Sequence, residues 1–517
     1  MIPLLALALV PLGCSDDGGY YSDGSTFGDE FGDDLGDGGT SGNSTGASDD
    51  GSVETSDDQV AEESDTSTET DTGAPLCDDQ SEVVLYLSPD DSNSMSSPVQ
   101  VRNQALVDQD IYGFNAPVRS WEFMNYYDFD YPAAEDGTLA LSASMRMVEG
   151  GAEGTARFQL QLAVSSEVMT DEERPPMNVT LVLDTSGSMK GQAINMLRES
   201  CRAIAASLRV GDTVSMVEWD VDNTWTLGGY AVSGPDDPTL LAAIDALGPG
   251  GGTNLYGGLD SGYELAQQVF DIDKLNRLVL ISDGGANAGI TDIDLIAENA
   301  AYGGSDGIYL VGVGVGNGHV YNDLLMDQVT DAGKGAAVFV PDEGEAWKVF
   351  HQDFVNTMGL AARNVQVELT MPPGFEIVKF SGEEYSGDPK EIEPQHIAPN
   401  DDMVFFQQIE TCAPELASDD AQITVRATWE DISTFETKEL VQSYSFAELL
   451  AADDKQLLEG AAIVATTDAL KLIKSQGLVN AQPSIDAAFL AIDEAKLAQP
   501  GDPDLAELEA VLMALSN

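Results

Sequence analysis

Asn178-Val179-Thr180-Leu181-Val182-Leu183-Asp184-Thr185-Ser186-Gly187-Ser188 is the stretch of sequence that decides the fold. Its first half is almost entirely apolar, as expected for a strand that is buried on both faces of a sheet. The residues after it predict a helix with one buried face, because apolar side chains recur with three- and four-residue spacing at Ile194, Leu197, Cys201, Ile204 and Leu208. A buried strand that leads through a polar loop into such a helix is typical of an α/β domain.

The same alternation continues to residue 355. Further strands are expected at Thr213–Trp219, Arg277–Ser282, Ile308–Val315 and Ala337–Val340, with helices between them at Thr239–Leu247, Gly257–Phe270, Asp292–Tyr302 and Asn322–Ala332. Strands that alternate with helices predict a Rossmann-like, doubly wound and mostly parallel sheet, with helices on both faces. We place this α/β domain at residues 177–355.

Two flanking regions have different patterns. Residues 77–170 are expected to be β-rich, with strands at Glu82–Leu87, Leu139–Val148 and Ala156–Val164 and an aromatic segment, Trp121–Pro132, that favours packing over ligand binding. Residues 356–517 are expected to form a β-rich and then helical domain. Its helical part begins near Ala447 and has breaks at Gln482-Pro483 and Pro500-Gly501.

The chain is strongly acidic, with 90 Asp and Glu residues against 22 Lys and Arg and a net charge of −68. Residues 15–76 are rich in Gly, Ser, Thr and Asp and lack Lys and Arg, so we expect a disordered acidic linker there. The charge excludes nucleic acid as a partner, because phosphate binding needs clustered basic residues. It favours a solvated acidic surface over weak divalent-cation binding by that surface.

Residues 1–14, MIPLLALALVPLGC, resemble a signal peptide of a bacterial lipoprotein. The apolar run is too short to span a bilayer but long enough for the core of an export signal. By that resemblance Cys14 becomes the acylated N-terminus, although no basic residue precedes the run and Pro11 departs from the usual motif. An ordinary cleaved signal and a mispredicted start are the alternatives. Export permits disulfides, and Cys77 and Cys412 flank the central domain, so we expect a bond between them.

Three polar loops follow buried segments of the α/β domain. Asp184-Thr185-Ser186-Gly187-Ser188 ends the first strand, Gly250-Gly251-Gly252-Thr253-Asn254 precedes a helix, and Ser282-Asp283-Gly284 closes a later strand. The carboxyl ends of parallel strands meet at one edge of the sheet, which is where ligands bind in open α/β sheets. Each motif alone is compatible with helix capping and turns, but the ordered set favours one shared site.

This constellation resembles the metal-ion-dependent adhesion site of the von Willebrand factor A superfamily. The resemblance implies that Asp184, Ser186, Ser188, Thr253 and Asp283 hold one divalent ion. Two carboxylates and three hydroxyls are hard oxygen donors that suit Mg²⁺, with Mn²⁺ or Ca²⁺ as alternatives. The family's chemistry leaves one coordination position open for an Asp or Glu carboxylate of a protein partner. Trp219 and Trp225 could line this face of the domain or serve as packing residues.

The aromatic segment, the metal-site domain and the C-terminal region together resemble the YfbK-type group of bacterial von Willebrand factor A proteins, which are often lipoproteins. The resemblance implies an exported, lipid-anchored adhesion module of the cell envelope, and Ser15 after Cys14 favours the outer membrane. We expect a binding protein and not an enzyme. A surface or stress scaffold with a purely structural metal is the alternative, and a metal-dependent hydrolase is a third hypothesis. The sequence leaves the oligomeric state open.

Overall fold

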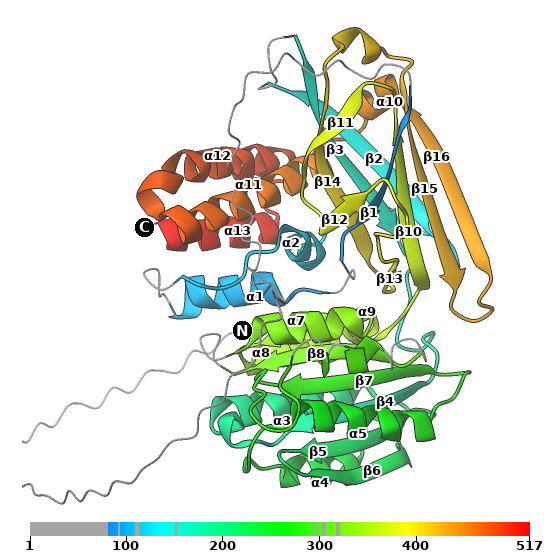
Figure 1. Ribbon diagram of the computed structural model, residues 1–517, viewed down its shortest axis with the longest axis vertical. Helices are drawn as coiled ribbons and strands as arrows, with labels where there is room; N and C mark the ends of the chain where they lie inside the picture. The colour runs from blue at the N-terminus through cyan, green and yellow to red at the C-terminus, as the bar shows by residue number, and fades with distance from the viewer. Residues whose placement is uncertain are drawn as a thin grey trace, which may run out of the picture. The chain divides into compact units, whose positions relative to one another are not determined.

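β4 (Met177–Asp184) is the central strand of the α/β domain, and all eight of its residues are buried. The computed structural model describes residues 81–90, 94–108, 114–149, 154–292, 295–296, 298–301, 307–316 and 321–516. Cys14, Cys77 and the expected linker at residues 15–76 lie outside these ranges. Helices and strands are labelled in Figure 1.

In the described part of the chain, six strands form the central sheet in the order β6-β5-β4-β7-β8-β9. β6 pairs with β5 in the antiparallel sense and the other neighbours are parallel, so the predicted mostly parallel sheet is confirmed. The sequence did not predict β6. Besides β4 the strands are β5 (Thr213–Trp219), β6 (Asn223–Ala231), β7 (Leu275–Ser282), β8 (Tyr309–Val315) and β9 (Ala337–Val340).

Helices cover both faces of the central sheet (Figure 1). On one face, Leu197 and Ile204 of α3 belong to the same buried cluster as Leu181 of β4. On the other face, Leu259 of α5 and Val329 of α7 belong to the cluster that contains the opposite side of β4. Among the described residues, the helices with defined bounds in this domain are α3 (Gln192–Ser207), α4 (Pro238–Ala246), α5 (Leu255–Gln268), α7 (Asp323–Ala332), α8 (Glu343–Trp347) and α9 (Phe354–Met358).

Two further sheets form a β-sandwich whose inner faces share one buried cluster. The first sheet has the order β12-β1-β10-β15-β16 with β13 also on β10, and the second has the order β11-β14-β3-β2. Their strands are β1 (Val83–Ser88), β2 (Ala140–Val148), β3 (Ala156–Ser165), β10 (Ala362–Met371), β11 (Phe375–Phe380), β12 (Glu384–Ser386), β13 (Gln395–Ile397), β14 (Asp402–Thr411), β15 (Gln422–Asp431) and β16 (Thr437–Ser445).

The sandwich draws strands from both sides of the α/β domain. β1 pairs with β10, and β3 pairs with β14 along its whole length. The strands of the two predicted flanking regions therefore belong to common sheets and do not form separate units. The α/β domain is inserted between β3 and β10 of the sandwich.

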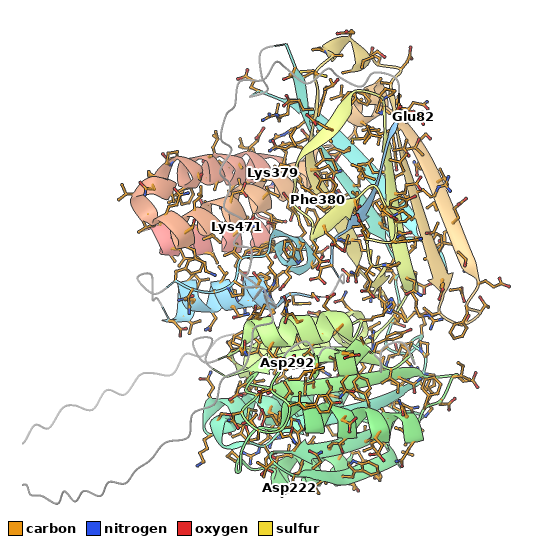
Figure 2. All side chains as sticks on the ribbon, viewed as in Figure 1. Glu82, Asp222, Asp292, Lys379, Phe380 and Lys471 are labelled. Carbon is orange, nitrogen blue, oxygen red and sulfur yellow. The ribbon has the colours of Figure 1, made fainter. Side chains whose placement is uncertain are left out.

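A group of helices packs beside the sandwich: α1 (Ser96–Arg102), α2 (Ser120–Tyr126), α10 (Phe446–Ala451), α11 (Lys455–Gln476), α12 (Leu478–Ala498) and α13 (Pro503–Ser516). Lys471 of α11 donates to Ser120 of α2 at 2.9 Å, and Lys379 of β11 pairs with Asp468 of α11. The two lysines are labelled in Figure 2. In the aromatic segment Phe123, Met124, Tyr127 and Phe129 are buried, which bears out the packing interpretation. None of the described helices is long and apolar enough to cross a membrane.

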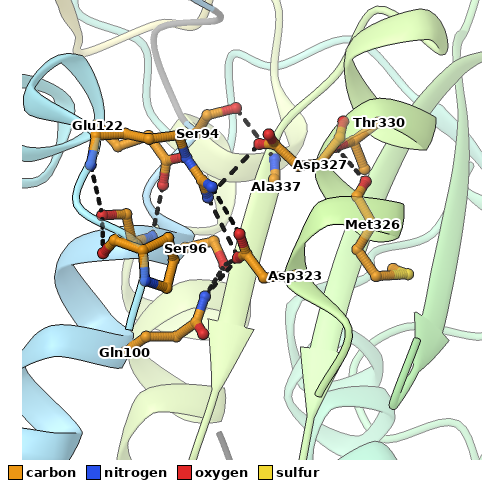
Figure 3. Close-up of polar contacts among 12 residues, drawn as sticks. Ser94, Ser96, Gln100, Glu122, Asp323, Met326, Asp327, Thr330 and Ala337 are labelled. Carbon is orange, nitrogen blue, oxygen red and sulfur yellow. Dashed lines mark hydrogen bonds and ion pairs between the residues drawn. The ribbon is translucent and has the colours of Figure 1, made fainter. Parts of the chain in front are cut away.

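The N-terminal helices α1 and α2 also contact the α/β domain. Gln100 of α1 donates to Asp323 of α7 at 2.5 Å, and Ser96 donates to the same carboxylate at 3.1 Å (Figure 3). Val99 of α1 is fully buried in the cluster that lies between the central sheet and α7. These contacts attach the N-terminal region to α7.

Candidate metal-binding edge of the central sheet

Asp184 is the last residue of β4, and its carboxylate is fully buried. The carboxylate accepts hydrogen bonds from the Ser186 N–H at 2.8 Å and from the Ser282 hydroxyl at 2.7 Å. The pKa of Asp184 is raised to about 6, mainly by burial and to a smaller extent by the nearby Asp283 carboxylate, while the hydrogen bonds from Ser186 and Ser282 oppose the shift. Among the described residues no Lys or Arg forms an ion pair with Asp184 or Asp283. A buried carboxylate in these surroundings favours a cation.

The first loop turns sharply after Asp184. A short 3₁₀ turn at Gly187–Met189 brings the hydroxyl of Ser186 to 3.0 Å from that of Ser188. Ser186 is fully buried, whereas Ser188 is exposed to solvent. The two hydroxyls therefore form a short row that runs from the buried carboxylate toward the surface.

The second loop is bonded to the first through the main chain. The Gly187 N–H donates to the Gly251 carbonyl at 3.1 Å, and the Gly250 N–H donates to the Thr185 carbonyl at 2.6 Å. Gly251 has a φ of +74°, and a Cβ at this position would lie 2.2 Å from a carboxylate oxygen of Asp220. A residue with a side chain is therefore excluded there. These bonds fix the start of the segment that carries Thr253.

The third loop is bonded to the second through Asn287. Its side-chain oxygen accepts from the Thr253 N–H at 2.9 Å, and its side-chain nitrogen donates to the Thr253 hydroxyl at 3.1 Å. The N–H groups of Asn287 and Ala288 both donate to the Thr253 carbonyl. The Thr253 hydroxyl, which is buried, is thus held in one orientation and keeps a lone pair for another partner.

All three loops meet beside Gly285. A methyl group placed on Gly285 would lie 3.1 Å from the Asp283 carboxylate, 3.5 Å from the Thr253 methyl group and 3.8 Å from the Ser188 hydroxyl. One side chain from each loop therefore approaches the same small volume. Ser282, next to Asp283, contacts Asp184 directly, so the structure brings all five predicted residues to one edge of the sheet.

Sequence reasoning missed Ser282 and Asn287 as supporting residues. Ser282 immediately precedes Asp283, donates to Asp184 and accepts from the Gly284 N–H. Asn287 lies four residues after Asp283. Their proximity in sequence to Asp283 was the available signal. The described residues hold no group of three or more His, Cys, Asp and Glu that could bind a metal. The five candidate residues at this edge offer two carboxylates and three hydroxyls.

The two tryptophans differ in burial. Trp219 is fully buried beneath α5, where a Cβ on Gly258 would lie 2.5 Å from its ring. Trp225 donates its indole N–H to Ser261 at 2.8 Å. Trp219 is therefore a packing residue, whereas the Trp225 side chain is 43% exposed.

The cysteines divide into a free thiol and a disulfide. Cys201 is buried and free, and burial raises the pKa of its thiol to about 12. Cys412 is disulfide-bonded. Cys77 and Cys14 lie outside the described residues, so the Cys77–Cys412 bond and the acylation of Cys14 stay predictions.

Comparison with known proteins gives the central domain a family. Residues 178–352 match the family model of the von Willebrand factor type A domain. The chain is 28% identical over 264 residues to the uncharacterized protein YfbK of Escherichia coli strain K12, which covers 50% of this chain and 45% of that protein. It is 26% identical over 249 residues to the uncharacterized protein sll0103 of Synechocystis, with 47% and 56% covered. The chain spans about half the length of these relatives.

Further similarity extends to an animal protein and to solved structures. Inter-alpha-trypsin inhibitor heavy chain H1 of Homo sapiens is 28% identical over 171 residues, 31% of this chain and 18% of that protein. A von Willebrand factor type A protein from Catenulispora acidiphila matches with a TM-score of 0.48 and 14% identity, covering 72% of this chain and 96% of that one. The ArnB paralog VWA2 from Sulfolobus acidocaldarius matches with a TM-score of 0.41 and 16% identity, covering 73% and 97%.

Proposed function

We propose, from the premise that residues 178–352 form a von Willebrand factor type A domain, that its metal-binding edge holds one divalent cation and captures an acidic side chain of a protein partner. Domains of this family are commonly interaction modules and are generally not enzymes. The observation that supports the proposal most is the approach of Ser188, Thr253 and Asp283 to one point beside Gly285.

The donor set fits a hard cation. Asp184 and Asp283 supply carboxylate oxygens, and Ser186, Ser188 and Thr253 supply hydroxyl oxygens. Mg²⁺ prefers about six oxygen ligands and binds through one or two carboxylates. Two carboxylates neutralise a divalent ion without excess negative charge, so a bound ion would still attract a further carboxylate. Mn²⁺ and Ca²⁺ have the same preference for oxygen.

The burial pattern supports access from one side only. Asp184, Ser186 and Thr253 are at most 1% exposed, whereas Ser188 lies at the surface. A partner would therefore approach over Ser188. Its Asp or Glu would meet the cation on that side, and the surrounding loop atoms would contact the rest of the partner.

The metal proposal is tested by calorimetric titration of the full chain with Mn²⁺. We expect one equivalent to bind to the natural protein and none to Asp184→Asn, which keeps the shape of the side chain but removes its charge. Asp245→Asn is the matched control, because this carboxylate is 63% exposed on α4 and pairs with Arg202. Binding of Mn²⁺ to Asp184→Asn at the natural affinity would contradict the proposal.

The capture step needs a separate titration. A short peptide with a single glutamate should bind the Mn²⁺-loaded protein, and the same peptide with glutamine should not. If Mn²⁺ binds and raises the melting temperature but the glutamate peptide gives no heat, the metal is structural. The protein would then be a scaffold and not an adhesion module.

We also propose that the chain is exported and anchored in a bacterial envelope through an acylated Cys14, with the outer membrane as its site. The motif at residues 12–15 supports this. Metabolic labelling with a fatty-acid analogue should mark the natural chain and not Cys14→Ser. Equal labelling of the two proteins, or none of either, would contradict it.

A further inference from the structure

A cavity of about 330 Å³ lies away from the metal-binding edge, where β7 and β8 begin. Its other walls come from the start of β10 and from the turn between β15 and β16. Ligand pockets in proteins commonly measure about 300–1,000 Å³, so this cavity has room for a small molecule. We call it the cationic pocket, for the four residues Lys274, Arg277, Lys334 and Arg363 that line it.

The charge of the cationic pocket is opposite to that of the chain. The chain has 22 Lys and Arg against 90 Asp and Glu, yet four basic residues and a single acidic one, Glu430, line this cavity. The acidic surface provides abundant partners for basic side chains elsewhere. Four cations around one small volume therefore indicate a site for negative charge.

Arg363 is a buried cation of this pocket with one unpaired donor. It is 9% exposed, donates to the Tyr309 hydroxyl at 3.1 Å and lies over the Phe435 ring, 4.0 Å from its centroid. Its separation from Glu430 is 3.8 Å, which is too long for a hydrogen bond. Its Nε is buried and has no hydrogen-bond partner among the described residues. A buried donor without an acceptor is costly, so the Arg363 guanidinium has unused hydrogen-bonding capacity beside the cavity.

Lys274 and Lys334 are only partly neutralised, and Arg277 adds a third positive charge. Arg277 donates to the carbonyls of Met358 and Gly359, Lys274 donates to the Gly211 carbonyl at 3.0 Å, and Lys334 pairs with the exposed Glu393 at 3.2 Å. The Gly211 carbonyl satisfies the Lys274 ammonium but leaves its formal charge, and the Glu393 carboxylate that pairs with Lys334 is 56% exposed. The pocket therefore keeps a positive field.

The positive charge also lowers the pKa of the neighbouring His396. Its ring packs edge-on against Tyr309, with the ring centroids 4.6 Å apart. The pKa of His396 is lowered to about 3, first by burial and then by Arg277, Lys334 and Arg363. The same three cations therefore act together on a group beside the cavity.

The cationic pocket also has apolar walls. Phe270 and Phe435 line it and are 38% and 47% exposed, and Ile272 is 66% exposed. A bare inorganic anion would leave these side chains in water. We propose that the cationic pocket binds a small organic anion, in which a carboxylate or phosphate group faces Arg363 and a single ring or short hydrocarbon group contacts the apolar wall.

The test is calorimetric titration of the full chain with benzoate and with phenyl phosphate. We expect at least one of them to bind, and the neutral analogue benzyl alcohol not to bind. Arg363→Met should weaken binding about tenfold or more, because it removes a charge-assisted contact while keeping an apolar stem. Addition of EDTA should leave the affinity unchanged, which separates this site from the metal-binding edge.

Arg426→Met is the matched control, since Arg426 lies on the same sheet, is 44% exposed and does not line the cavity. It should bind the anions as the natural chain does. If Arg363→Met does not fold, Lys274→Gln replaces it, with weaker binding expected. The proposal is overturned by natural affinity in a folded Arg363→Met protein, by equal binding of benzyl alcohol, or by the absence of heat from both anions at millimolar concentration.

Discussion

Arg119 donates two hydrogen bonds from its guanidinium to the carboxylate of Asp323, at 2.6 and 3.2 Å. Arg119 lies at the start of α2 and Asp323 at the start of α7. Arg119 also pairs with Glu122, whose side chain is fully buried, and lies 3.5 Å from Asp327 (Figure 3). One cation thus holds three carboxylates at the contact between the N-terminal helices and the α/β domain.

Replacement of Arg119 by Met should destabilise the protein by about 3–5 kcal/mol, because removal of one partner leaves a buried carboxylate without a cation. Urea unfolding followed by circular dichroism measures this. Arg202→Met is the control: that guanidinium is 33% exposed in its pairs with Glu199 and Asp245, and its loss should cost about 1 kcal/mol or less. Equal losses in the two variants would contradict the buried-network interpretation.

Ser282→Ala should weaken Mn²⁺ binding about 10- to 100-fold, the usual effect of losing a group that orients a metal ligand. The Ser282 hydroxyl donates to Asp184 and accepts from the Gly284 N–H, so the variant frees both loops that it joins. Ser200→Ala is a matched control, because this serine is equally buried in the same domain but its hydroxyl has no hydrogen-bond partner among the described residues. Calorimetry should show that Ser200→Ala binds Mn²⁺ with the same affinity as the natural chain.

Glu459→Gln should make the protein more stable at pH 8 and little changed at pH 4. Glu459 is 1% exposed on α11, and burial raises the pKa of its carboxyl from 4.5 to about 8. Between these values the folded chain keeps a proton that the unfolded chain has lost. Stability therefore falls as pH rises through this window, by at most about 1.4 kcal/mol per pH unit.

Thermal or urea unfolding from pH 4 to 8 measures the difference in free energy of unfolding between Glu459→Gln and the natural chain. Glu494→Gln, at a carboxylate that is 52% exposed on α12, is the control variant. If the free energy of unfolding changes with pH in the same way for Glu459→Gln and the natural chain, Glu459 is not protonated in the folded protein over this pH range.

Gly312→Ala should destabilise the α/β domain by about 1–3 kcal/mol through overpacking. A Cβ on Gly312 of β8 would lie 2.0 Å from the methyl group of Thr330 on α7. Thr330→Ser removes that methyl group and keeps the hydroxyl, which donates to the Met326 carbonyl. The double variant should recover part of the loss in a double-mutant cycle. Additive losses would show that the clash lies elsewhere.

Local pattern was sufficient for most of the α/β domain. β5 and β9 have the predicted bounds, because apolar strands between turn residues are distinctive. β6 was missed because it is a largely exposed edge strand with two glycines, which gives it no hydrophobic pattern. The predicted break at Pro483 is wrong: α12 continues through it, and the helices separate at Gly477, where φ is +77°. A proline removes one hydrogen bond near the start of a helix, which packing can offset.

Long-range pairing could not be predicted in the same way. Nothing in the sequence near Val83 indicates that it pairs with Met371. At the candidate metal-binding edge the five oxygen-bearing residues could be grouped from the sequence because their types and order are distinctive. Ser282 and Asn287 were missed because supporting hydrogen bonds depend on how two loops approach each other, and that distance is set by the whole sheet.

The insertion of the α/β domain into the sandwich has a consequence for biosynthesis. The strand β3 is made early, but its partner β14 leaves the ribosome only after the whole inserted domain. All strands of the central sheet come from the inserted domain itself. It can therefore fold first. During this time β1, β2 and β3 have edges without their final partner strands, and such edges are prone to incorrect pairing. A chaperone that shields nascent strands would find its substrate in this interval.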